Sequence, residues 1–154
     1  MPVKDLVRII EAMTDQAATA SKDPDSLLEA ARIALAPQIA AMFAKNGTAE
    51  VITLEPTLEQ SLAASLQLTE RGRQLGNSTE ELEHLVSSLA SVVSEAEAAG
   101  KQPVLVCSSK VRPAIRRLIR ARLPHTAVLA APEISSNARI STIGVVRRVQ
   151  AVAL

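Results

Sequence analysis

The segment from Lys101 to Leu123 constrains the fold most, because its pattern changes from strand to helix at its middle. The short apolar run Val104–Cys107 is typical of a buried strand. A helix is indicated next by apolar residues at helical spacing, and a second strand-like run follows at 126–130. A strand, a helix and a strand in this order predict a βαβ unit with two parallel strands. The apolar residues of the helix are Val111, Ile115, Leu118 and Ile119.

The rest of the chain supplies helices before this unit and one strand after it. Amphipathic helices are predicted after Pro2, after Pro24 with a kink at Pro37, and after Ser78, whose pairing with Glu81 forms a capping box. A strand is predicted at 51–54, a loop at 69–78, and a bulged or edge strand around Gly144. We therefore predict an α/β protein: an N-terminal helical subdomain at 1–47, then a small βαβ-type sheet flanked by helices at 48–154.

The net charge of +1 hides an asymmetry between the two ends of the chain. Residues 1–100 carry 7 Lys and Arg against 15 Asp and Glu, whereas residues 101–154 carry 10 against 1. The two parts therefore have net charges of −8 and +9. Either packing between copies of the chain or internal packing of a basic element on an acidic one would satisfy this pattern, and so would separate solvated faces.

Arg112, Arg116 and Arg120 follow one another at steps of four, so they form a basic stripe on one side of the predicted helix. Nucleic acid is one ligand for such a stripe. The chain has one Phe and no Trp or Tyr, which excludes base-stacking platforms, and its first hundred residues are acidic. We therefore predict a stripe that faces another protein or solvent, and no nucleic-acid partner.

Cys107 is the sharpest catalytic candidate, because it lies where a strand ends and a helix begins. Helix-start amides with Lys110 and Arg112 suit a thiolate and a bound anion, as in a small rhodanese or phosphatase. The loop has no glycine to wrap an oxyanion, and Cys107 is in register with buried Val and Leu. A core cysteine is thus the favoured interpretation, and a thiol enzyme is the alternative.

Other chemistry has no recognisable motif in this sequence. His84 and His125 are isolated from each other and from Cys107, and no phosphate-binding glycine loop is present. The carboxylates Glu80, Glu81 and Glu83 open a helix, where the helix dipole favours acidic residues. Neither a signal peptide nor a run of about 20 apolar residues is found. We expect no catalytic residue, metal or cofactor.

Several ordered blocks of the chain resemble one protein family. These blocks are PVKDLVRIIEAMTDQA, KDPDSLLEAARIALAPQI, VITLEPTLEQSL, PVLVCSSKVRPAIRRLIRARLPHTAVLAAPEI and GVV. Together they span nearly the whole chain and resemble the C-terminal part of the cytosolic domain in the FHIPEP export-gate family of type III secretion. The amino-acid sequences of the first and third blocks are more similar to those of flagellar members than to those of injectisome members.

The resemblance implies a non-enzymatic component of a bacterial protein-export gate at the cytoplasmic side of the inner membrane. Its full-length relatives form a homo-oligomeric ring and dock chaperone–substrate complexes and other export-apparatus proteins. This chain would correspond to the third and fourth cytosolic subdomains, with Met1 inside a longer protein and no membrane contact of its own. Because the helical subdomain supplies ring contacts in relatives, the implied interface candidates are Lys4, Glu11 and Arg32, each of which could instead form an ion pair within the chain.

Overall fold

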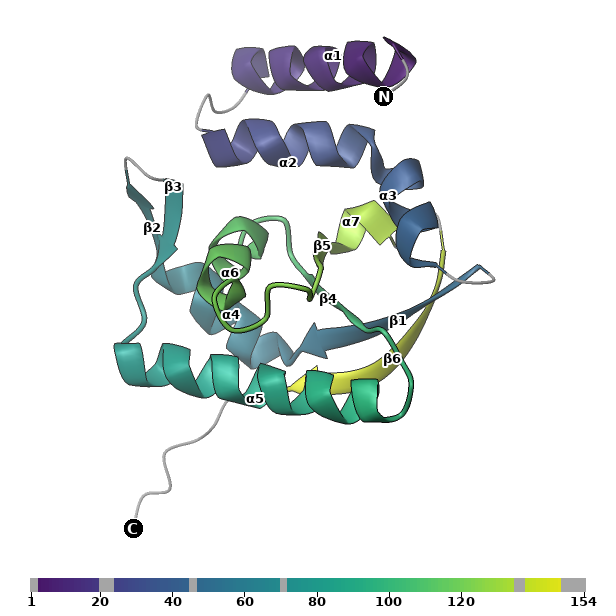
Figure 1. Cartoon of the computed structure of the whole chain (residues 1–154). Coiled ribbons are helices and arrows are strands. Elements are labelled where there is room, and N and C mark those ends of the chain that lie inside the picture. The colour runs from purple at the N-terminus through teal and green to yellow at the C-terminus, as the bar shows by residue number, and fades with distance from the viewer. Residues whose placement is uncertain (1–2, 20–23, 45–46, 70–71, 135–137, 148–154) are drawn as a thin grey trace.

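A computed structural model describes residues 3–19, 24–44, 47–69, 72–134 and 138–147, in which helices surround one parallel sheet (Figure 1). The sheet has the strand order β5-β4-β1-β6, and a separate pair is formed by β2 and β3. The helices are α1 (Val3–Thr19), α2 (Pro24–Ala34), α3 (Ala36–Phe43), α4 (Pro56–Ser65), α5 (Thr79–Ala98), α6 (Arg112–Ile119) and α7 (Ala131–Ile134). The strands are β1 (Thr48–Leu54), β2 (Leu66–Thr69), β3 (Gly72–Leu75), β4 (Val104–Cys107), β5 (Val128–Ala130) and β6 (Arg139–Val146).

The predicted βαβ unit is confirmed. Strand β4 leads through α6 into β5, and the two strands pair in parallel with Val106 opposite Leu129. On its other side β4 pairs in parallel with β1, where Leu105 is opposite Ile52. The segment from Lys101 to Leu123 therefore supplies a central strand and the helix that covers it, which confirms the α/β fold class.

The sheet is apolar on both faces, because alternate residues of each strand point to opposite sides. One face joins Ile52, Leu105 and Cys107 to residues of α4, α5 and α6. The other face joins Val51 and Val106 to Ala40 of α3 and Ile134 of α7. Helices thus cover both faces, as expected for a parallel sheet.

The helical N-terminus forms a layer outside this body. Figure 1 shows α1 and α2 stacked at the top of the view, with α1 outermost. The kink predicted at Pro37 is found as a break at Leu35, two residues earlier: α2 ends at Ala34, α3 begins at Ala36, and the two helices are bent by 74°. Pro37 has no backbone N–H to continue the α2 ladder, so the chain turns at Leu35. Helix α3, which the predicted boundary at residue 47 groups with α1 and α2, contributes Ala40 to the core of the sheet.

Strand β6 lies at an edge of the sheet, and its register with β1 shifts between Val51 and Ile52, as the sequence predicts. A Cβ atom on Gly144 would overlap the Val92 side chain of α5, so glycine allows α5 to pack closely on β6. The N-cap half of the predicted capping box is present, with the Glu81 N–H donating to Ser78 Oγ at 3.2 Å, and the Glu81 carboxylate accepts a hydrogen bond from Asn77 Nδ2 at 3.0 Å.

The predicted loop at 69–78 is partly wrong, because β2 and β3 form an antiparallel pair with Gln67 opposite Gln74. The pair continues from α4, where Leu66 turns from helix to extended backbone. Leu66 and Leu75 pack on the body from this pair, which explains the pairing of a polar segment.

Candidate assembly surface and the charged seam beneath it

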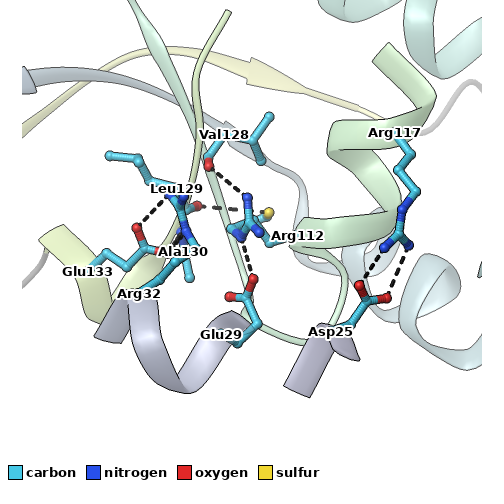
Figure 2. Close-up of polar contacts among 10 residues, drawn as sticks. Asp25, Glu29, Arg32, Arg112, Arg117, Val128, Leu129, Ala130 and Glu133 are labelled. Carbon is cyan, nitrogen blue, oxygen red and sulfur yellow. Dashed lines mark hydrogen bonds and ion pairs between the residues drawn. The ribbon is translucent and has the colours of Figure 1, made fainter. Parts of the chain in front are cut away.

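The arginine-rich helix α6 turns its first arginine into the protein. Pro113 occupies the first turn, where the missing N–H costs no hydrogen bond, so the helix starts soon after β4. Arg112 is 4% exposed; its Nε donates to Glu29 Oε1 at 2.6 Å and its Nη1 to the Val128 carbonyl at 3.5 Å. Figure 2 shows Arg112 between these two groups. Arg112 therefore neutralises a buried carboxylate of α2, and the prediction that it faces a partner does not describe this residue.

Two further ion pairs join α2 to the α/β body (Figure 2). Arg117 donates to both carboxylate oxygens of Asp25, which is 2% exposed. Arg32 binds Glu133 in the same two-pronged way, with Nε and Nη2 at 3.0 and 2.9 Å. Such paired geometry holds both partners in a fixed orientation. We call these six residues the charged seam: Asp25, Glu29 and Arg32 of α2, Arg112 and Arg117 of α6, and Glu133 of α7.

The spacing of the seam residues on α2 explains why they meet the body together. Asp25, Glu29 and Arg32 are separated by four and three residues, so they share one face of the helix. Asp25 also lies in the first turn, where a negative charge is favoured by the helix dipole. On the other side, Glu133 is fully buried and also accepts a hydrogen bond from the Ala130 N–H at 3.4 Å.

The seam is not fully satisfied. Burial raises the pKa of the Glu29 carboxyl above its ordinary value, although the Arg112 guanidinium opposes the shift. Glu29 Oε2 is buried without a hydrogen-bond partner among the described residues, and so is Nη1 of Arg116, an α6 residue outside the seam. Removing such groups from water costs free energy that their existing contacts recover only in part.

The predicted basic stripe therefore divides along its length. Arg112 is inside, Arg116 is half-buried, and Arg120 is exposed. Arg117, which lies outside the predicted stripe, forms the ion pair with Asp25. The basic helix α6 thus packs on acidic residues of α2 within the same chain. This is one of the arrangements that the charge asymmetry of the sequence allows.

The outer face of α1 carries the other predicted residues. Lys4 and Glu11 are exposed, and between them Val7 and Ile10 are 47% and 55% exposed. Leu6 is 50% exposed at the border of the same face. An apolar row bounded by charges is the composition of a protein-binding surface. Arg32, the third interface candidate, instead pairs with Glu133 inside the chain.

Cys107 lies in the core and not at an open site. The residue is 3% exposed, and its Sγ lies 3.9 Å from the Leu129 carbonyl. Burial raises the pKa of the thiol well above its ordinary value. A thiol that is neutral and enclosed is not a nucleophile, so the geometry does not support the thiol-enzyme alternative.

Among the described residues, no group of three or more His, Cys, Asp or Glu side chains could hold a metal ion. In the part of the chain that the structure describes, no single helix is long and apolar enough to cross a membrane, although α2 and α3 taken together as a bent pair are, by length and composition.

Sequence reasoning missed four seam residues, namely Asp25, Glu29, Arg117 and Glu133. The two members of each ion pair are 83 to 101 residues apart in sequence, so no local sequence pattern could pair them. A weak signal was present: Asp25 and Glu29 belong to the acidic part of the chain, whereas Arg112 and Arg117 belong to the basic part.

Comparison with known proteins gives consistent matches. The FHIPEP family model matches residues 1–139. The Flagellar biosynthesis protein FlhA of Bacillus subtilis (strain 168) is 33% identical over 145 residues, which cover 94% of this chain and 21% of that protein. The chain thus spans about a fifth of the length of this curated relative.

Two solved structures share the fold. The Chlamydia pneumoniae CdsV protein aligns with a TM-score of 0.79 at 27% identity, covering 94% of this chain and 41% of that one. The nonameric EscV cytosolic domain from the type III secretion system aligns with a TM-score of 0.74 at 26% identity, covering 94% and 42%. With its sequence matched over residues 1–139 and its fold shared with these structures, the chain belongs to the FHIPEP family.

Proposed function

We propose that this chain is a cytosolic part of a bacterial type III protein-export gate that assembles with copies of itself into a ring. Support comes from the family match over residues 1–139 and from the similarity to a nonameric cytosolic domain of a type III secretion system. The flagellar relative at 33% identity favours a flagellar gate. The complete protein would lie in the inner membrane with this part on its cytoplasmic side, and its role would be non-enzymatic.

The outer face of α1 is the proposed ring contact. Its exposed residues Val7 and Ile10 lie between Lys4 and Glu11 along the helix axis, so the apolar row has a charged residue at each end. Interfaces of this composition derive most of their affinity from the apolar centre, and the charges fix the orientation. Because Arg32 is held by Glu133, the proposed contact is restricted to α1.

In the assembled ring, the chain would help to dock export chaperones, their substrates and other export-apparatus proteins. Its covered sheet and its buried Cys107 serve this role as a scaffold and not as a reaction centre. The observation that carries the proposal is the family match, and the exposed row on α1 is where it can be tested.

The test uses the complete export protein in a bacterium that depends on it. Ile10→Glu places a charge in the centre of the α1 row, whereas Ser94→Glu places the same charge on the exposed face of α5 and is the control. We expect Ile10→Glu to abolish cross-linked ring species and to reduce secretion at least about tenfold, with Ser94→Glu unchanged. Normal rings and normal secretion in the Ile10→Glu strain would refute the α1 contact.

A further inference from the structure

Strand β6 closes the sheet on one side and has an open outer edge (Figure 1). In the strand order β5-β4-β1-β6, its one neighbouring strand among the described residues is β1. The opposite edge strand, β5, runs directly into α7, which packs on it. Of the eight residues of β6, only Val146 is buried. The edge of β6 is therefore accessible to another strand.

The hydrogen bonds of β6 show which of its backbone groups face outward. The Arg139 N–H donates to the Gly47 carbonyl at 2.9 Å, so Arg139 turns its backbone toward β1. Successive residues of a strand turn their N–H and C=O groups to opposite sides, so Ser141 also faces β1, whereas Ile140 and Thr142 face outward. The register with β1 is regular over these four residues of β6 and shifts only beyond Thr142. Their outward groups thus form a regular stretch with which an added strand can pair.

The side chains along this edge favour pairing with an extended apolar segment. Ile140 and Val145 are 43% and 42% exposed, and Thr142 is exposed between them. These β-branched side chains pack well against the cross-strand neighbours that an added strand brings. Because an open edge of this kind also invites unwanted pairing, the charges beside it decide which strands it accepts.

The charges at this edge favour an acidic partner. No Asp or Glu follows Glu133 in the sequence, and exposed arginines lie at both ends of β6, at 139 and 147. Arg147 also lines a cavity with Glu80 and Glu81, so Arg139 is the stronger attraction for an acidic residue.

The same arginines disfavour a second copy of the chain at this edge. Two copies paired along the whole strand would place Arg139 against Arg147 in an antiparallel pair, or Arg139 against its own counterpart in a parallel pair. Like charges directly opposite each other destabilise paired strands, whereas carboxylates at these places would stabilise them. An acidic strand from another protein therefore fits the edge better than a second copy does.

We propose that the outer edge of β6 binds an extended acidic segment of another protein as a fifth strand of the four-stranded sheet. The bound segment would have β-branched residues at its centre and carboxylates at its ends. This site is separate from the α1 contact proposed for the ring and can be tested on this chain alone, so the two proposals can fail independently.

Peptide binding to the full chain tests the proposal. The probe is the fluorescently labelled peptide Glu-Thr-Val-Thr-Val-Thr-Val-Thr-Glu with blocked ends, and its control has Lys in place of both Glu residues. By fluorescence anisotropy, we expect the acidic peptide to bind at least about tenfold more tightly than the basic one. Its binding should shift the amide NMR signals of Ile140 and Thr142.

A pair of variants at one position tests the backbone pairing. Thr142→Pro removes an outward N–H and leaves the hydrogen bonds to β1 in place, so it should weaken binding of the acidic peptide at least about tenfold. Thr142→Ala keeps this N–H and should bind like the parent. A folded Thr142→Pro variant that binds as tightly as Thr142→Ala would overturn the proposal.

Charge reversal provides a test that does not depend on how well proline is tolerated. Arg139→Glu with Arg147→Glu should transfer the preference to the basic peptide. Arg120→Glu with Arg122→Glu makes the same change of charge at exposed positions and should keep the preference of the parent.

Three further results would overturn the proposal. The first is equal affinity of the parent for the two peptides, and the second is an unchanged preference after reversal of Arg139 and Arg147. The third is a dimer of the parent in analytical ultracentrifugation that Thr142→Pro abolishes, because this would assign the edge to a second copy.

Discussion

The α/β body and the α1–α2 layer are held in place by different forces. In the body, Ile52, Leu89 and Leu105 are fully buried among apolar neighbours on one face of the sheet. At the layer, the buried residues of α2 are Asp25, Ser26, Glu29 and Ala31, and both carboxylates are paired with an arginine of α6. One chain therefore uses apolar packing to form its body and ion pairs to position a second layer on it.

The difference teaches what each kind of contact can do. Apolar burial supplies most of the stability and tolerates small displacements, because it depends on area and not on direction. A buried ion pair adds little net stability, but it fails when one partner is removed or displaced. The seam therefore specifies where α2 lies more than it stabilises the fold, and substitutions can separate these two roles.

The largest effect is expected from the body. Leu89→Ala should lower the free energy of unfolding by roughly 3–5 kcal/mol, because it leaves a cavity between α5 and the sheet. Ile10→Ala on the outer face of α1 removes an apolar side chain of similar size but should cost less than about 0.5 kcal/mol in the separate chain. Urea unfolding measures the free energy of unfolding of both variants. Similar losses for the two variants would contradict the contrast between a packed body and an open α1 face.

The next effect comes from the fully buried end of the seam. Glu133→Gln keeps the shape of the side chain but removes the charge that neutralises Arg32, so the free energy of unfolding should fall by about 2–3 kcal/mol. Glu97→Gln, at an exposed position of α5, is the matched control and should change little. If the two variants unfold at the same urea concentration, the charge of Glu133 does not contribute to the free energy of unfolding.

Close packing of α5 on β6 gives a smaller effect. Gly144→Ala places a methyl group against Val92, so one of the two elements must shift at a cost of roughly 1–3 kcal/mol. Ser141→Ala on the exposed part of the same strand controls for the change in composition. Thermal unfolding compares them, and an unaltered midpoint for Gly144→Ala would show that α5 does not approach the strand so closely.

The smallest effect concerns pH at the seam. Burial raises the folded-state pKa of Glu29 above its ordinary value of 4.5, so the folded state binds this proton more tightly than the unfolded state. The contribution of Glu29 to the free energy of unfolding therefore falls as pH rises from about 4.5 through the raised pKa. Because Glu29→Gln removes this titration, the free energy of unfolding of the parent minus that of the variant should fall as pH rises over this range. A difference that rises with pH would reverse the sign of the shift.

Local patterns in the sequence were sufficient for most of the body. The apolar run at Val104–Cys107 and the helical spacing after it predicted β4 and α6, and Gly144 predicted an irregular edge strand. The β2–β3 pair was missed because its residues are mostly polar and its stability comes from Leu66 and Leu75 packing on the body.

The candidate site was harder to predict, because it depends on long-range pairing. The family resemblance suggested Lys4 and Glu11 as interface candidates, and both are exposed on α1. Arg112 was expected outside, since an arginine at helical spacing usually reaches solvent, and only the partner Glu29 from a distant helix makes its burial favourable. The opposite charges of the two parts of the chain were the only sequence signal of this contact.

Native-state hydrogen exchange of the unmodified chain tests the central claim most directly, because it compares the opening of both regions in one experiment. If ion pairs hold α2 on the body and apolar packing holds the sheet together, the α2 amides should exchange at least about tenfold faster than those of β1 and β4. Equal rates in α2, β1 and β4 would show that the chain opens only as a whole, and would contradict the account.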